Sequence, residues 1–188
     1  MNYLTKLKHK NLIVSLLSIL LSTFLVGCSS VKATDYVNNQ PKLTADYFDG
    51  SMTAHGIVKN RSGKVIRYFN VDMLARRDGN GVITLEEDFL FDDGEEQRRI
   101  WTLTPTQDNN YKASANDVVG SADMNFSGNA LFMNYVLNIP YKKRSIDINV
   151  DDRMYLINPD MLVNESVLTK WGFRVGSLSL VIIKSPQI

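Results

Sequence analysis

The chain has 188 residues, and 21 Lys and Arg residues are balanced by 20 Asp and Glu residues, for a formal net charge of +1 at pH 7. A balance this close to neutral argues against nucleic acid as a partner, because binding to phosphates requires a basic surface. The chain has one cysteine and, beyond residue 27, one histidine. An intramolecular disulfide, a multi-histidine metal site and a structural zinc site are therefore excluded, and we expect no metal and no cofactor.

Residues 1–27 have the pattern of a secretory signal peptide. Three lysines and no acidic residue occur in the first ten positions, and an almost wholly apolar run follows at 12–26. This run is shorter than the roughly 20 apolar residues that a membrane-spanning helix needs. A retained transmembrane anchor is the alternative interpretation.

The sequence Leu25-Val26-Gly27-Cys28 resembles the bacterial lipobox, in which a diacylglyceryl group is added to the cysteine thiol before cleavage just ahead of it. We predict that Cys28 carries lipid and begins the mature chain. Two or more acyl chains give stable anchoring, so the membrane is an expected partner. Ser29, not Asp, follows Cys28, which resembles lipoproteins of the outer membrane. We expect a cell-envelope protein, anchored in the outer membrane and facing the periplasm of a Gram-negative bacterium.

The next segment, 28–42, is polar and contains Pro41 near its end. It has no sustained hydrophobic periodicity, and we interpret it as a lipidated tether. Residues 43–188 then form the predicted domain, which is long enough for one sizeable core.

From Ser51 onward the chain is rich in segments in which apolar residues occupy alternate positions. Side chains alternate between the two faces of a strand, so each row predicts the inward face of a half-buried strand. The rows are Val65, Arg67, Phe69, Val71 and Met73; Ile83, Leu85, Glu87, Phe89 and Phe91; Leu131, Met133, Tyr135, Leu137 and Ile139; Ile146, Ile148, Val150, Asp152, Met154 and Leu156; and Leu178, Leu180 and Ile182.

Residues that favour tight turns separate these segments; they lie at 61–63, 78–81, 92–94, 108–110 and 158–160. Short strands at such spacing are typical of a sandwich or a barrel, and consecutive hairpins without a long crossover favour the barrel. We predict an all-β fold, an antiparallel up-and-down β-barrel of roughly 8–10 strands. The segment 161–171 is interpreted as a strand, although Pro159 is also compatible with the start of a short helix.

Three of the apolar rows contain one charged residue each: Arg67, Glu87 and Asp152. Buried charges are usually paired, so we expect these residues to meet inside the barrel, joined by Arg99, which shares a face with Trp101. One interpretation is a polar cluster that orients the head group of an amphiphilic ligand while aromatic residues surround its tail. The alternatives are a purely structural ion-pair network, or charges at the barrel mouth that reach water.

His55 lies in Ala54-His55-Gly56, where the glycine indicates a bulge or a close backbone approach. A general base needs a nucleophile and an orienting acid, but the chain has no Gly-x-Ser-x-Gly motif and no free cysteine in its mature part. We therefore interpret His55 as a hydrogen-bonded or ligand-contacting residue and expect no enzymatic activity. The acidic residues at 86–96 are interpreted as a solvated turn, because the spacing of a calcium loop is missing.

Seven segments of the chain form a distinctive set. They are Thr53-Ala54-His55-Gly56-Ile57-Val58, Arg61-Ser62-Gly63-Lys64-Val65-Ile66-Arg67, Glu87-Asp88-Phe89, Phe91-Asp92-Asp93-Gly94-Glu95, Gln97-Arg98-Arg99-Ile100-Trp101, Asp152-Arg153-Met154-Tyr155-Leu156-Ile157 and Lys170-Trp171-Gly172-Phe173-Arg174-Val175-Gly176. These segments resemble a family of proteobacterial lipoproteins catalogued as domain of unknown function 3833, and the likeness runs from Cys28 to about Lys184. The resemblance implies a lipocalin-like barrel and no catalytic residue, and the occurrence of such genes beside enzymes that modify membrane fatty acids implies a lipid ligand.

Three functional hypotheses follow. The leading one is a binding module that holds or carries a fatty acid or similar amphiphile in a barrel cavity. The second is a scaffold lipoprotein without a ligand that docks a membrane enzyme. The third is an enzyme acting on lipid, with His55 used together with Glu87 or Asp152.

Overall fold

The computed structural model describes residues 31–107 and 110–185. The predicted signal segment and its lipid-attachment residue Cys28 lie outside the described residues. The chain divides into two units, Met1–Lys32 and Ala33–Ile188, and the fold described here is that of the second unit. Within the described ranges, no helix combines the length and the apolar composition needed to cross a membrane.

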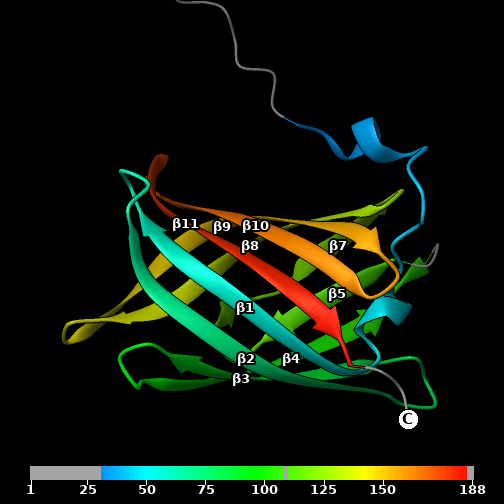
Figure 1. The fold of residues 1–188 in the computed structure, drawn as a ribbon, viewed down its shortest axis with the longest axis horizontal. Coiled ribbons are helices and arrows are strands. Elements are labelled where there is room, and N and C mark those ends of the chain that lie inside the picture. Colours follow the sequence, from blue (N-terminus) through cyan, green and yellow to red (C-terminus); the bar gives the residue numbers. More distant parts are fainter. Residues whose placement is uncertain (1–30, 108–109, 186–188) are drawn as a thin grey trace, which may run out of the picture. The chain divides into compact units, whose positions relative to one another are not determined.

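The second unit is a closed antiparallel β-barrel (Figure 1). Apart from β6, a two-residue strand on β8, each strand pairs with the next around the barrel, and β11 pairs with β1. This confirms the predicted all-β, up-and-down barrel. The strands are β1 (Gly50–Asn60), β2 (Val65–Arg77), β3 (Ile83–Phe91), β4 (Glu96–Pro105), β5 (Tyr111–Ala115), β6 (Val118–Val119), β7 (Ala122–Ser127), β8 (Ala130–Tyr141), β9 (Arg144–Asn158), β10 (Met161–Lys170) and β11 (Phe173–Lys184).

The alternating rows form the inner wall of the barrel. In β2, Phe69 and Val71 are buried, and the intervening Asn70 is exposed. The same alternation of burial holds at the start of β3 and through the middle of β9. The segment 161–170 is the strand β10, and Pro159 lies in the turn before it, so the strand interpretation is confirmed over the helix.

Part of the segment expected to be a tether packs on the barrel. The short 3-10 helix η2 (Ala33–Tyr36) brings the Tyr36 ring to 5.7 Å from the ring of Phe132 and 5.4 Å from that of Tyr155. Phe132 sits on the outward face of β8, yet it is buried because η2 covers it. The folded domain therefore begins earlier than residue 43.

A second 3-10 helix, η3 (Ala45–Phe48), lies at the barrel end where β9 turns into β10. The Tyr47 hydroxyl donates to the backbone oxygen of Ile182 at 3.1 Å and to that of Asp160 at 3.3 Å. Burial, aided by the negative charge of Asp160, raises the pKa of Tyr47 to about 12. Tyr47 is therefore a neutral donor that holds η3 in place, and the adjacent Phe48 side chain reaches the barrel interior.

Of the bulge or close backbone approach expected at Gly56, the bulge is absent because strand pairing is regular there, and the close approach is made by neighbouring side chains. A Cβ atom at this position would lie 2.4 Å from Cζ of Phe69 and 2.7 Å from Cβ of Leu180. Contacts this short are sterically forbidden, so the glycine makes room for the Phe69 ring inside the barrel. Because Gly56 takes the inward position, its neighbour His55 points outward.

Candidate functional site

The barrel encloses a cavity of about 100 Å³. Most of its wall is apolar and comes from nearly every strand together with Phe48 of η3. Methionines form a large part of this wall, at positions 73, 124, 133 and 154. Methionine has three rotatable bonds and adapts to irregular spaces, so this wall is more deformable than one built of branched side chains.

A set of polar side chains from opposite walls of the barrel points into the interior. We call this set the inner polar cluster, and its members are Glu87 on β3, Arg99 on β4, Asp117 between β5 and β6, Asp152 on β9, and Asn164 and Ser166 on β10. All of them except Asp117 line the cavity. The cavity lining is therefore amphiphilic, and the two kinds of side chain are neighbours: Met73 pairs across strands with Glu87, and Met133 pairs with Asp152.

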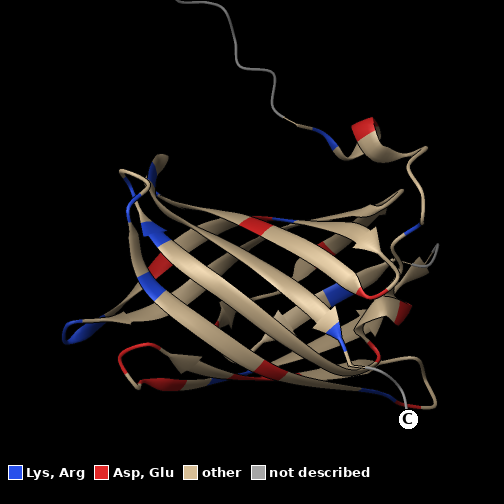
Figure 2. Ribbon diagram, viewed as in Figure 1, with Lys and Arg blue, Asp and Glu red and all other residues tan. Residues whose placement is uncertain are grey.

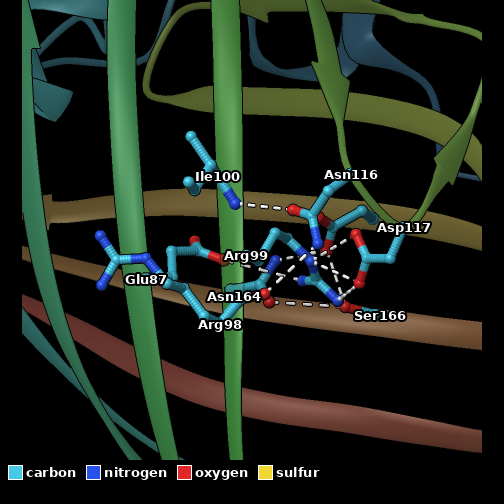
Figure 3. Close-up of polar contacts among 9 residues, drawn as sticks. Glu87, Arg98, Arg99, Ile100, Asn116, Asp117, Asn164 and Ser166 are labelled. Atoms are coloured by element: carbon cyan, nitrogen blue, oxygen red, sulfur yellow. Dashed lines mark hydrogen bonds and ion pairs between the residues drawn. The ribbon is translucent and has the colours of Figure 1, made fainter.

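The centre of the inner polar cluster is the guanidinium of Arg99 (Figure 3). Its Nε donates to both carboxylate oxygens of Asp117 at 2.9 Å, and its Nη2 donates to Oδ2 of Asp117 at 2.8 Å. Its Nη1 lies 3.7 Å from Oε2 of Glu87. Burial opposes the charge on Arg99, but Glu87 and Asp117 outweigh it and raise the pKa of the guanidinium.

Glu87 is the least satisfied member of the cluster. Its Oε2 atom is buried and has no hydrogen-bond partner among the described residues. Burial raises the pKa of Glu87 to about 7; Arg99 and a hydrogen bond from Trp101 oppose this rise, and the negative charges of Asp117 and Asp152 add to it. Glu87 therefore changes its protonation state near neutral pH.

Asp152 lies on β9, across the barrel from β3 and β4 in the strand order, and is buried. Its Oδ1 accepts from Nδ2 of Asn164 at 2.5 Å and from Oγ of Ser166 at 2.7 Å. Burial raises its pKa, although these two hydrogen bonds and Arg99 act against the rise. In residues 31–107 and 110–185, no group of three or more His, Cys, Asp or Glu side chains is arranged to hold a metal ion.

Two aromatic side chains of the cavity lining contact each other beside the inner polar cluster. The Trp101 and Tyr135 rings meet edge to face, with their centroids 5.5 Å apart. Burial raises the pKa of Tyr135 well above its ordinary value, so its hydroxyl stays neutral. The guanidinium of Arg99 also lies 5.4 Å from the centre of the Phe89 ring and 5.8 Å from that of Trp101.

Four of the residues selected from the sequence come together here: Glu87, Arg99, Trp101 and Asp152. Arg67 does not join them, which corrects the expectation that all three charged rows meet.

Arg67 donates to Asp93 at 2.8 Å and to Glu95 at 2.9 Å, and it stacks 3.6 Å above the centre of the Phe91 ring. Pairing between β2 and β3 ends at Phe69 and Phe91. Arg67 therefore lies beside the β3–β4 turn at the barrel end, which corresponds to the barrel-mouth alternative.

His55 also lies outside the cavity. Its side chain is exposed, and its Nδ1 is 2.7 Å from Oδ1 of Asn70 on the outer face of β2. It is not among the residues that line the cavity with Glu87 and Asp152. The arrangement required by the lipid-enzyme hypothesis, with His55 beside one of these acids, is therefore not present.

Three members of the inner polar cluster were missed by sequence reasoning. Asp117 lies in a short turn between two short strands, where no periodic pattern marks an inward position. Asn164 and Ser166 alternate with outward residues in β10, between Leu162 and Leu168. Their alternation with outward residues marks them as inward-facing if the segment is a strand. Because Pro159 also allowed a short helix here, this alternation did not identify them.

The fold and the cavity together define a lipocalin-like barrel with charged groups in its interior. Residues 22–184 match the family described as "Protein of unknown function (DUF3833)". The chain belongs to this family, which confirms the resemblance seen in the sequence. No curated protein sequence matches the chain.

Solved structures with a similar fold are only distantly related in sequence. The S-type phycobiliprotein lyase CPES from Guillardia theta is 14% identical, with 76% of this chain and 91% of that chain covered and a TM-score of 0.47. EF1p2_mFAP2b bound to DFHBI is 8% identical, with 76% and 97% covered and a TM-score of 0.42. The odorant-binding protein OBP1 is 13% identical, with 79% of each chain covered and a TM-score of 0.33. Likenesses of this kind carry no function to this chain.

Proposed function

We propose that the protein is a lipid-anchored binding module that holds an amphiphile inside its barrel. The polar group of the ligand lies at the inner polar cluster, and its apolar part lies against the methionine-rich wall. The observation that carries this proposal is the mixed polar and apolar lining of the cavity, above all the buried Glu87 Oε2 atom that has no hydrogen-bond partner among the described residues. A purely structural ion-pair network has no need of an open acceptor beside an apolar space.

The size of the cavity sets a condition on this function. A volume of about 100 Å³ is below the range of about 300–1,000 Å³ that is usual for ligand pockets. It is closer to an engineered apolar cavity of about 150 Å³ that admits benzene. A ligand with an acyl chain, such as a fatty acid or a relative with another polar group, therefore requires the methionine side chains to change rotamer on binding.

The proposed anchor determines where the ligand is exchanged. Diacylglyceryl modification of Cys28 keeps the barrel at a membrane surface, in our proposal the periplasmic face of the outer membrane. Mass spectrometry of the mature N-terminal peptide tests this directly. We expect a lipid-modified Cys28 as the first residue, and an unmodified or uncleaved N-terminus contradicts the anchor.

Native mass spectrometry of protein extracted from its own membrane tests the binding function. We expect a bound species of the mass of a small amphiphile. The Met73→Phe variant, which fills the cavity, should lose this species and remain folded, and the matched Arg67→Met variant should keep it because Arg67 lies outside the cavity. A ligand-free wild-type protein that also takes up no added amphiphile overturns the proposal.

A second candidate function, a module that docks a membrane enzyme, is favoured by exposed aromatic side chains at hairpin tips. Trp171 is 84% exposed, Phe173 is 67% exposed and Tyr141 is 52% exposed. Tyr141 lies at the tip of the β8–β9 hairpin, and Trp171 and Phe173 lie at the tip of the β10–β11 hairpin; large exposed apolar side chains can mark interaction sites. Lys and Arg residues occupy the same hairpin tips, and acidic residues occupy the β3–β4 turn (Figure 2).

This second function is tested by placing a photo-crosslinking residue at Trp171 and, as a control, at the exposed Glu165 in the outer face of β10. We expect a defined membrane enzyme to be captured only from position 171. Equal capture from both positions, or none from either, overturns the docking function.

A further inference from the structure

The charges of the inner polar cluster do not balance. Three carboxyl groups, those of Glu87, Asp117 and Asp152, act on a single guanidinium, that of Arg99. Within the described part of the chain, no other Lys or Arg side chain lines the cavity. The interior therefore has an excess of acceptors and of potential negative charge.

The one cation of the cavity is already engaged. Asp117 takes three hydrogen bonds from Nε and Nη2 of Arg99, and Nη1 lies opposite Glu87 at 3.7 Å. A carboxylate prefers the paired N–H groups of a guanidinium edge, and Asp117 already occupies such an edge. An ionised carboxylate in the ligand would meet Glu87 and Asp152 first and would add a fourth carboxyl group to the cluster.

Acceptors, by contrast, are available at the cavity wall. The buried Oε2 of Glu87 receives no hydrogen bond from the described residues, and the hydrogen bonds to Asp152 from Asn164 and Ser166 both go to Oδ1. A buried acceptor without a donor costs free energy until a donor arrives. The group that satisfies this site is one that brings N–H or O–H bonds into it.

We propose that the polar group of the ligand is a hydrogen-bond donor, an amine or a hydroxyl, that donates to Glu87 and Asp152, and that an ionised fatty acid is disfavoured. This inference rests on the proposed function, because it requires an amphiphile in the cavity. It assigns a direction to each interaction: the ligand donates, and the inner polar cluster accepts.

The ionisation of Glu87 distinguishes the two kinds of donor. With its pKa near 7, Glu87 is largely protonated at pH 6 and largely ionised at pH 8. An ammonium group binds more tightly as Glu87 gains its charge, whereas a neutral hydroxyl responds less. The charged and titratable groups that act on Glu87 are Arg99, Asp117 and Asp152, and they are the same for every ligand compared.

The test compares dodecylamine, dodecanol and dodecanoate, which share one chain length, by calorimetric titration of the full-length protein below micelle-forming concentrations. At pH 8 we expect the amine and the alcohol to bind at least about tenfold more tightly than dodecanoate, the equivalent of one hydrogen bond to a charged group. Between pH 6 and pH 8 the affinity for the amine should rise.

Two variants complete the test. Glu87→Gln should remove most of the advantage of the amine over dodecanoate, and Arg67→Met should leave all three affinities unchanged. Tightest binding of dodecanoate to the wild type, or an unchanged preference in Glu87→Gln with its barrel folded by circular dichroism, overturns this inference alone. If none of the three compounds binds, the proposed function itself fails.

Discussion

Two groups of charged side chains near β2, β3 and β4 share one sequence pattern and differ in how exposed their carboxylates are. Arg67, whose side chain is 25% exposed, pairs with Asp93 and Glu95 in the β3–β4 turn, whose side chains are 57% and 49% exposed. Glu87 and Arg99 belong to the inner polar cluster, and their side chains are only 12% and 19% exposed. All of these strand side chains belong to inward-facing rows. Their position along the barrel axis therefore decides whether a charged group is solvated at the barrel end or buried beside the cavity.

The energetic consequences differ in the same way. Exposed ion pairs contribute about 0–1 kcal/mol to stability, because water and salt screen them. Removing one partner of a buried pair costs about 3–5 kcal/mol, because it leaves the other charge uncompensated in a poorly solvated place. The comparison therefore predicts large effects inside the barrel and small ones at the hairpin.

The largest expected effect is that of Arg99→Met. This change leaves Glu87 and Asp117 without their cation, and we expect the free energy of unfolding at pH 8 to fall by about 3–5 kcal/mol. Urea unfolding followed by circular dichroism measures it. The added change Glu87→Gln should recover part of the loss, because it removes one of the uncompensated charges. A loss below about 1 kcal/mol, the range of an exposed pair, contradicts a buried role for Arg99.

The next effect is a dependence of stability on pH that originates at Glu87. Its pKa is about 7 in the folded protein and 4.5 ordinarily. Between these values the folded protein holds a proton that the unfolded chain releases, so stability falls as pH rises through this window. The total decrease is about 3 kcal/mol. Unfolding of the wild type and of Glu87→Gln, measured from pH 4.5 to pH 8, should show the variant gaining relative stability as pH increases.

The control for this dependence is Glu165→Gln, which neutralises an exposed carboxylate on the outer face of β10. Its stability should follow the wild-type curve at every pH. If the curves of Glu87→Gln and the wild type run parallel as well, Glu87 titrates as an ordinary surface acid, and the distinction between the two groups of charges fails.

The smallest effect is expected at the hairpin. Arg67→Met keeps an apolar chain near the Phe91 ring and removes both the ion pairs to Asp93 and Glu95 and the cation–π contact with this ring. We expect a loss of about 1–2 kcal/mol, and added salt should reduce it further. Chemical unfolding at low and at high ionic strength measures this difference. If Arg67→Met lowers the free energy of unfolding as much as Arg99→Met does, the proposed difference between the two groups of charges is wrong.

The barrel itself could be predicted from the sequence because side-chain alternation is a local property of a strand. Phe69, Val71 and Asp152 were assigned to the inner face without knowledge of any partner. Alternation does not predict where along the barrel axis each charged side chain lies. That position depends on the register between strands and on the residue at which strand pairing ends. Arg67 was therefore grouped with Glu87, although it lies past the last pair of β2 and β3.

The N-terminal segment 28–42 shows a second reason why the sequence did not predict part of the structure. Its polar composition predicts a tether, but Tyr36 packs against Phe132 and Tyr155. Hydrogen bonds to the backbone groups of Ala33 and Leu43 also join this part of the chain to the barrel. A few isolated contacts of this kind produce no periodic pattern. Asp117 was missed for a related reason, because a turn residue becomes part of the inner polar cluster only through the folding of β4 beside β5.

Titration of the Glu87 carboxyl group, followed by carbon NMR of glutamate-labelled protein with and without saturating dodecylamine, most directly tests whether the inner polar cluster accepts a donor from the ligand. We expect a pKa of about 7 in the free protein and a lower pKa in the complex, because a bound ammonium group favours the ionised carboxylate. A Glu87 titration that is identical in the free and the dodecylamine-saturated protein would contradict this expectation.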